Sequence, residues 1–428
     1  MKKLKYLLLM AVALLPMTLR SPVAVAFSNA ELPLDLEGTL HDAAYHIRVP
    51  ENWNGTLLVY AHGYPQYPVE DPEVAFLAEE QLLEQGYALA ASGFRGAGYN
   101  VQEAVQDTKH LTDYFKQVVG KPDRTVLYGV SMGGIITLLS MEQFPGTYDA
   151  GIPMCGVEGG ITKSMASKFT IALAYDAAFG WLDSWGAVDD VRDDIEFYND
   201  VWFAKVYDEF FVPAYPANFA RWEFVRLVSD LPLGGYYSYS GPVAMPPGAI
   251  AMMYFATGQR AELEVRAGGR ISTNVGYVYT LSDAERAYLL GLDPTLDIDG
   301  MLAEMNAMTG IEADPWALAY LRRYGEYNGH LHGPVLMAHN VEDPIAPVEG
   351  TTEYANLVMS AGNQDLLTRV YSGLPGHCNF TEDQVLALFA AMDGWLDTGV
   401  APTPDAFPET LDFVHGFEPG PWPQPPAE

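Results

Sequence analysis

The chain has 428 residues, of which 49% are hydrophobic, and it carries 55 acidic against 23 basic residues. Its formal net charge of −32 at pH 7 argues against nucleic acid and anionic membrane surfaces as partners, because both are polyanions. The length exceeds the roughly 100–200 residues of a usual single domain, so we expect one large domain with an insertion, or two domains.

The first 26 residues have the pattern of a secretory signal peptide. Three lysines precede an apolar run over residues 6–17, and a small-x-small cleavage site ends at Ala26. The run is too short, and too interrupted by Pro16, for a lasting membrane anchor. We therefore expect residues 1–26 to be removed, which leaves a net charge of −36, and the mature protein to be secreted or periplasmic without stable membrane insertion.

Strands alternate with helices over residues 27–156, which we interpret as the first part of the core. Strands that are apolar throughout are covered on both faces, and their alternation with helices predicts an α/β fold with a mostly parallel sheet. We expect a hairpin or edge strand over 38–50, strands over 56–61, 87–92, 124–130 and 150–155, and helices over 74–85, 101–119 and 133–143.

The stretch 125–134 joins one of these strands to the next helix through Gly129-Val130-Ser131-Met132-Gly133. A strand, a sharp turn and a helix are what is needed to hold a serine hydroxyl on a strained tip above a sheet. Glycine at both ends of this turn has a physical reason, since a Cβ there would collide with neighbouring backbone. A Gly/Ser loop that merely opens a helix is the alternative.

Residues 157–332 break the alternation and predict a helical insertion, a lid or cap with its own core. Its acidic runs 189–194 and 293–299 do not match the spacing of an EF-hand loop, so we expect helix caps and solvated faces and no metal site. Its many aromatic and methionine residues could wall an apolar pocket, although at helical spacing such residues usually pack the lid against itself. These aromatic and methionine residues are Trp181, Trp185, Tyr198, Trp202, Phe203, Trp222, Tyr236, Tyr237, Met252, Met253 and Tyr254. The helices predicted for the lid are 162–182, 189–206, 216–231, 282–290, 300–308 and 315–324.

The core pattern resumes over residues 333–400. We expect strands over 334–339 and 367–371 and helices over 351–360 and 381–396. The tail, residues 401–428, is Pro-rich and acidic, which predicts a surface strap or a partly disordered segment.

A serine is a poor nucleophile unless a base takes its proton, and the base needs an orienting acid. In this kind of fold the acid and then the histidine follow the serine, each just past a strand. Asp343 follows the predicted strand 334–339, with Glu342 as a rival, and His377 follows the strand 367–371. We therefore predict Ser131, Asp343 and His377 as the catalytic residues. The other histidines near the end of the lid, His330, His332 and His339, match no metal-site spacing.

The negative charge that develops on the substrate oxygen needs two preorganised donors. We assign one to the backbone N–H of Met132, next after the serine, and the other to the backbone N–H of Tyr64, in the loop after the strand 56–61. His62 and Gly63 are expected to shape that loop.

Five motifs together resemble the α/β-hydrolase superfamily, over residues 37–160 and 333–398. They are His62-Gly63-Tyr64, the turn 95–98, the pentapeptide 129–133, the acid loop at Asp343 and the histidine loop at His377. The resemblance implies that the lid follows the sixth strand of the sheet. Together the five motifs are specific for the superfamily but not for any substrate.

Only two cysteines, Cys155 and Cys378, are present. In an oxidising compartment a single pair predicts one disulfide, with two buried free thiols as the alternative. The chain also resembles tannases and feruloyl esterases, in which a disulfide ties the histidine loop to a cysteine directly before the serine. That position is Val130 here, which leaves aryl-ester specificity open, and our hypothesis is that Cys155 reaches Cys378 instead.

The function that these residues predict is that of a secreted serine esterase working through an acyl-enzyme, on a small-molecule or polymeric ester and without a cofactor. Two alternatives stay open. One is a peptidase or aminopeptidase with the same triad, in which lid acids would capture a substrate amine. The other is a non-catalytic binding protein that keeps the fold, which predicts a displaced or blocked triad.

Overall fold

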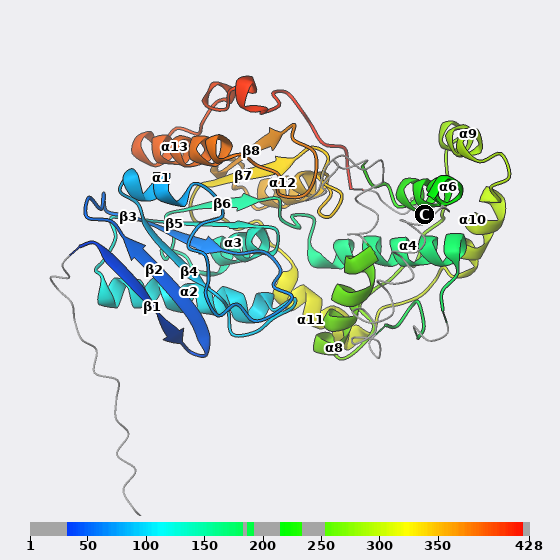
Figure 1. Ribbon diagram of the computed structural model, residues 1–428, viewed down its shortest axis with the longest axis horizontal. Coiled ribbons are helices and arrows are strands. Elements are labelled where there is room, and N and C mark those ends of the chain that lie inside the picture. Colours follow the sequence, from blue (N-terminus) through cyan, green and yellow to red (C-terminus); the bar gives the residue numbers. More distant parts are fainter. Residues whose placement is uncertain (1–31, 183–185, 192–214, 233–252, 423–428) are drawn as a thin grey trace, which may run out of the picture.

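The computed structural model describes residues 32–182, 186–191, 215–232 and 253–422. A sheet with helices on both faces forms one side of the molecule, and most of the helices of residues 157–332, here called the lid, form the other (Figure 1). Among the described residues, no helix is long and apolar enough to cross a membrane.

The sheet has eight strands in the order β1-β2-β4-β3-β5-β6-β7-β8. β2 runs antiparallel to both of its neighbours, and the other pairs are parallel. An α/β fold with a mostly parallel sheet is thus confirmed, and its strand order is that of the α/β-hydrolase fold. The strands are β1 Leu34–Leu40, β2 Ala43–Val49, β3 Thr56–Ala61, β4 Ala88–Ser92, β5 Arg124–Val130, β6 Ala150–Met154, β7 Val335–Asn340 and β8 Leu367–Ser372.

The central strands are buried because helices cover both faces of the sheet. Along β3, Leu57, Val59 and Ala61 join the hydrophobic cluster on one face, while Leu58 and Tyr60 join the cluster on the other. Successive side chains of a strand point to opposite faces, so a strand covered on both must be apolar throughout.

The helices around the sheet divide between these two clusters. One cluster contains residues of α2 Val101–Val118, α3 Met132–Gln143 and α12 Gly350–Ser360, and the other contains residues of α1 Glu79–Glu84 and α13 Glu382–Thr398. The helix predicted over 74–85 is wrong in its first part. Ala78 adopts a left-handed backbone conformation with φ 59°, so the helix begins only after it, and Val74 and Ala75 are buried as irregular chain.

The lid helices lie between β6 and β7 in the chain. They are α4 Ile161–Phe179, α6 Tyr215–Val228, the π-helix η4 Phe255–Gln259, α8 Arg260–Ala267, α9 Asp283–Leu292, α10 Ile298–Ala307 and α11 Pro315–Gly325. η4 and α8 were not predicted. Of the helix predicted over 189–206, the part over 189–191 is wrong, because an isolated bridge joins Ala187 to Asp190, and the part from 192 lies outside the described residues.

The tail forms a strap beside the last strand of the sheet. The tail contains two short 3₁₀ helices, η6 Pro404–Ala406 and η7 Glu409–Leu411, and after them Phe413 forms an isolated bridge with Ser372 of β8. A third 3₁₀ helix, η5 Gln364–Leu366, lies directly before β8. Trp422 is buried, and its ring lies where a side chain on Gly159 would otherwise extend. The strap therefore reaches the segment where the lid begins.

Candidate active site

The proposed nucleophile lies on a strained turn between β5 and α3. Ser131 has φ 56° and ψ −119°, a conformation that L-residues rarely adopt. A Cβ built on Gly129 or Gly133 would overlap the carbonyl oxygen of Ala61 on the neighbouring strand. The turn therefore needs glycine on both sides of the serine, for the steric reason that the sequence predicted.

The acid loop begins where β7 ends. Asp343 is fully buried, and its Oδ1 accepts hydrogen bonds from the backbone N–H groups of Ile345 at 2.8 Å and Ala346 at 2.9 Å. These two bonds fix the carboxylate and leave Oδ2 to face the histidine. The side chain of its rival Glu342 is exposed. The backbone carbonyl of Glu342 joins the acid loop to the histidine loop by accepting from the Gly376 N–H at 2.9 Å.

The histidine loop brings the three predicted residues together. His377 Nδ1 lies 2.7 Å from Asp343 Oδ2, and His377 Nε2 lies 2.8 Å from Ser131 Oγ. Since a carboxylate can only accept, Nδ1 carries the proton and Nε2 is free to accept from the serine hydroxyl. Asn340 holds the loop by donating to the carbonyls of Leu374 at 3.0 Å and Asn379 at 2.7 Å.

Cys155 and Cys378 form a disulfide, which confirms the predicted pairing, with Cα atoms 5.3 Å apart. Cys155 follows β6 directly, and Cys378 follows the histidine. The bond therefore ties the base to the segment that leads into the lid. Val130 occupies the position before the serine, on the strand beside β6.

The loop after β3 passes directly beside the serine. A Cβ built on Gly63 would lie 3.4 Å from Ser131 Cβ, so Tyr64 comes next to the nucleophile. Met132 is the first residue of α3, where backbone N–H groups are not used by the helix itself. These positions suit the two predicted oxyanion donors, whose role stays a prediction. His62 is stacked on Phe94 with ring centroids 4.1 Å apart, as expected of a residue that shapes the loop.

Two side chains of the lid lie against the same loop. The ring of Tyr64 meets Tyr254 and Phe255 edge-on, with centroids 6.1 and 6.2 Å apart. Phe255 is the first residue of η4 and Tyr254 directly precedes it, and single-turn π segments occur often at functional sites. Of the singled-out lid aromatics that the structure describes, Tyr254 is thus the one with a ring contact to Tyr64.

Other lid aromatics pack within the lid. Trp222 is fully buried and lies 5.6 Å from the ring of Tyr175 and 4.8 Å from that of Phe179, while Met253 and Trp181 belong to the same cluster. Trp222, Met253 and Trp181 therefore support the lid. The remaining candidates, Trp185, Tyr198, Trp202, Phe203, Tyr236, Tyr237 and Met252, lie outside the described residues.

Three buried charged groups behind the acid were not predicted. His339, Glu158 and Lys168 are 0–2% exposed. Lys168 Nζ donates to the carbonyl of Ile345 in the acid loop at 2.8 Å. Burial lowers the pKa of Lys168 to about 7, against the opposing effect of the Asp343 charge. The sequence offered no pairing signal, since these residues come from three different elements.

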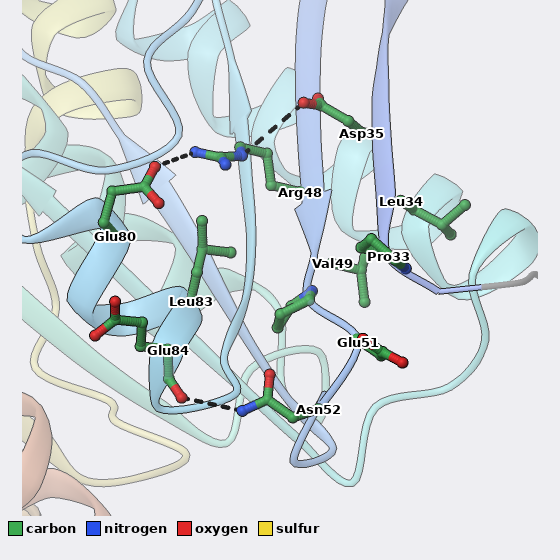
Figure 2. Close-up of a pocket in the computed structure, with 11 residues that line it drawn as sticks. Pro33, Leu34, Asp35, Arg48, Val49, Glu51, Asn52, Glu80, Leu83 and Glu84 are labelled. Carbon is green, nitrogen blue, oxygen red and sulfur yellow. Dashed lines mark hydrogen bonds and ion pairs between the residues drawn. The ribbon is translucent and has the colours of Figure 1, made fainter.

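A separate pocket of about 430 Å³ lies between the β1–β2 hairpin and α1 (Figure 2). Arg48 crosses it, with Nη1 2.9 Å from Glu80 and Nε 4.0 Å from Asp35. Asn52 donates to the backbone carbonyl of Glu84 at 3.0 Å. The predicted catalytic residues do not line this pocket, so it is not the candidate active site.

No profile of a known protein family matches the chain. An o-phthalyl amidase of Xanthobacter agilis is 23% identical over 88% of this chain and 90% of its own. Solved structures with a similar fold include feruloyl esterase B of Aspergillus oryzae, at 17% identity, with 86% of this chain and 81% of that chain covered and a TM-score of 0.42. An acylaminoacyl peptidase of Pyrococcus horikoshii matches at 10% identity, 89% and 43% coverage and a TM-score of 0.40.

The strand order and the strand-to-helix turn around Ser131 define the fold, which is that of the α/β-hydrolases. The amidase is a distant sequence relative of this chain. The bond that is cleaved, ester or amide, does not follow from the fold.

Proposed function

We propose that this protein is an exported serine hydrolase that cleaves carboxylic esters through an acyl-enzyme. The observation that carries the proposal is the continuous path of hydrogen bonds from Ser131 through His377 to Asp343, with lengths of 2.8 and 2.7 Å. A nucleophile, a base and an orienting acid in this arrangement are the components of acyl transfer.

In the first half of the reaction, Ser131 Oγ attacks the ester carbonyl while His377 Nε2 takes its proton. Asp343 stabilises the imidazolium, and the N–H groups of Met132 and Tyr64 bind the oxyanion. His377 then protonates the leaving alcohol, and the acyl group stays on Ser131. Water, deprotonated by His377, attacks the acyl-serine in the second half and releases the acid.

Amide cleavage is the second candidate, and the name of the amidase relative favours it. The same residues would carry it, with His377 protonating a leaving amine in place of an alcohol. A peptidase or aminopeptidase is one form of this candidate. The assembled hydrogen bonds argue against the remaining alternative, a binding protein without catalysis.

The proposal of export rests on the pattern of residues 1–26 and on the disulfide, which persists in oxidising compartments. N-terminal sequencing of the protein recovered from the native host's culture medium or periplasm tests it. A chain that starts after Ala26 is expected, and an intact N-terminus on protein found only in the cytoplasm would contradict export.

The test of the reaction is labelling by a fluorophosphonate probe together with turnover of an acyl-matched pair, a p-nitrophenyl ester and a p-nitroanilide. The variants are Ser131→Ala and Ser360→Ala. Ser360 is exposed at the end of α12, so its replacement controls for loss of a serine hydroxyl as such.

We expect the wild type and Ser360→Ala to be labelled and to cleave the ester, and Ser131→Ala to do neither. Turnover of the anilide at a rate equal to or above that of the ester would favour the amidase candidate. A folded wild type that is not labelled and turns over neither substrate would overturn the proposed function.

A further inference from the structure

A second, buried histidine lies close to Asp343, the predicted acid. His339 is the penultimate residue of β7, four residues before Asp343. Its side chain is fully buried, and its Nε2 donates to the carbonyl of Ala346, within the acid loop, at 2.7 Å. The same Nε2 lies 3.7 Å from Asp343 Oδ2, the oxygen that accepts from His377.

The other ring nitrogen of His339 faces a buried carboxylate. Nδ1 lies 3.2 Å from Glu158 Oε2, and both side chains are 0% exposed. Glu158 is held in turn, since its Oε1 accepts from the Gly156 N–H at 2.9 Å. Among the described residues, neither Glu158 Oε2 nor His339 Nδ1 has a hydrogen-bond partner, and the 3.2 Å contact between them is an ion pair. As an ion pair, the two groups compensate one another's burial.

We propose that His339, held by Glu158, is a positioning residue of the triad: its buried cation fixes the acid loop and sets how strongly Asp343 attracts the proton of His377. This proposal rests on the proposed function, because it assigns a role within that same reaction. His339 does not touch the reacting atoms and acts through Asp343.

The physical basis is the competition of two cations for one carboxylate oxygen. In a buried site, a unit charge within about 4–6 Å changes the proton affinity of a neighbour by about 1–3 pH units. Without the His339 charge, Asp343 would hold the imidazolium of His377 more tightly. His377 would then lose its proton at a higher pH, and the enzyme would need a higher pH to generate its base.

The charges around His339 and Asp343 together set the electrostatic potential at these two groups. His339 is faced by Glu158 from the segment after β6, by Asp343 from the acid loop and by Glu349 from the start of α12. Asp343 is also faced by Lys168 from α4 and by His377. Burial alone would lower the pKa of His339, but the carboxylates of Glu158 and Asp343 outweigh it and raise the pKa to about 9. His339 therefore stays charged over the range in which His377 works.

The test measures the rate of fluorophosphonate labelling, and of ester turnover, against pH for the wild type, His339→Gln and the double variant Glu158→Gln/His339→Gln. A glutamine amide can keep the hydrogen bond to Ala346 without the charge. The double variant removes both buried charges, so it remains testable where the single variant, left with an unpaired Glu158, fails to fold.

The matched control is His415→Gln. His415 makes the same kinds of contact in the tail strap, with Nε2 2.6 Å from the carbonyl of Phe407 and Nδ1 3.8 Å from Glu409, but its side chain is 32% exposed. It therefore controls for the loss of a histidine hydrogen bond and ion pair away from Asp343.

We expect the acidic limb of both profiles to move to higher pH by about 1 unit in His339→Gln, and by a smaller amount in the double variant, with no movement in His415→Gln. A lower rate at every pH with an unmoved midpoint, or a midpoint moved to lower pH, would overturn the positioning role. A wild type that neither labels nor turns over ester refutes the proposed function itself, so the two failures are distinguishable.

Discussion

The sheet core and the lid differ in where their buried charged side chains lie: in the core His339, Glu158 and Asp343 gather near the ends of strands, whereas in the lid Arg260 and Glu264 lie on one helix. Near the sheet, the core consists mostly of aliphatic and aromatic residues contributed by strands and by helices that alternate with them. The lid also has an apolar cluster, but charges lie within it. Arg260 and Glu264 of α8 are both fully buried, with Nε and Oε1 3.5 Å apart, and the Arg260 guanidinium lies 5.2 Å from the centre of the Phe169 ring.

The lid is also joined to the core by polar contacts. Glu262 accepts from the Tyr99 N–H at 2.7 Å, and Arg266 donates to the carbonyl of Ala97 at 2.7 Å, both next to the loop after β4. At the other end of the lid, Glu142 of α3 accepts from the N–H groups of Asn328 and Gly329 at 2.9 and 2.8 Å. Apolar packing also joins the lid to the sheet, since Ile161, Leu263 and Leu321 belong to one of the sheet clusters, and the directional contacts at the two ends of the lid add to it.

The predicted catalytic residues and the lid are thus positioned by different features of the fold. Ser131, Asp343 and His377 follow the ends of strands, where the sheet geometry places them. The lid is joined to the core by apolar packing and by the polar contacts of Glu262, Arg266 and Glu142, whose partners come from elements far apart in the chain. Variants of the core and of the lid test this contrast.

Asp343→Asn is expected to reduce kcat for ester turnover by about 10⁴-fold, because an amide cannot stabilise the imidazolium and favours the wrong tautomer of His377. Glu342→Gln, at the exposed neighbouring position, should change kcat by less than about twofold. Steady-state kinetics on the two purified variants measure both. Comparable losses in the two would mean that the acid has been assigned to the wrong residue.

Loss of the disulfide in Cys155→Ala/Cys378→Ala is expected to lower the free energy of unfolding by about 2–5 kcal/mol, since the bond closes a loop with a sequence separation of 223. Activity should fall as well, because His377 would no longer be tied to the end of β6. Denaturant unfolding with and without reductant measures the effect. Reductant should lower the denaturant midpoint of the wild type and leave that of the variant unchanged. A wild-type midpoint that does not change with reductant would refute the prediction.

The buried acid of the lid predicts a pH dependence of stability. Burial raises the pKa of Glu264 from 4.5 to about 7, despite the opposing charge of Arg260. Because the pKa of Glu264 is higher in the folded protein than in the unfolded chain, protonated Glu264 stabilises the fold fully below about pH 4.5, and this stabilisation is lost as the pH rises through about 7.

Glu264→Gln removes this titration. The stability of the wild type relative to the variant should therefore fall by about 1–3 kcal/mol between pH 4.5 and 7. Unfolding by urea at a series of pH values measures it, with Glu304→Gln, at an exposed position of the lid, as the control. A difference that does not change with pH would show that the carboxylate is ionised throughout.

Two helix caps allow the core and the lid to be compared directly. Ser282 at the start of α9 and Thr381 at the start of α13 each form a capping box, with Glu285 and Gln384. Replacing either cap by alanine should cost about 1 kcal/mol. We expect Ser282→Ala to destabilise the lid alone, since its apolar cluster is distinct from those of the sheet, and Thr381→Ala to destabilise the core.

Hydrogen exchange followed by peptide mass spectrometry locates the effects of the two cap replacements. Faster exchange confined to lid peptides in Ser282→Ala, and to core peptides in Thr381→Ala, is the expected result. Equal loss of protection in both regions for both variants would show that lid and core unfold as one unit.

Much of the core could be predicted because its signals are local. An apolar run long enough for one strand, followed by glycine or proline, marks the end of that strand, and Ser131, Asp343 and His377 each follow such a run. The carboxyl ends of parallel strands meet at one edge of the sheet, so the order of the motifs along the chain already implied their proximity. The start of α1 was misplaced because a left-handed residue, Ala78, overrode a helical pattern.

The disulfide shows where local signals end. The cysteine count predicted a bond and the neighbouring strands made the pairing plausible, but only the folded chain brings the two Cα atoms within 5.3 Å. The pairing of Glu158 with His339, and of Glu262 with the Tyr99 N–H, had no signal at all.

Local signals in the sequence were thus enough to predict the fold class, the strained turn at Ser131 and the proximity of Asp343 and His377 to it, because propensity, periodicity and turn chemistry act over a few neighbouring residues. The tertiary structure alone decided the buried partners of the acid loop and the contacts of the lid with the core. A buried charge is defined by what surrounds it in space, and those neighbours come from elements far apart in the chain.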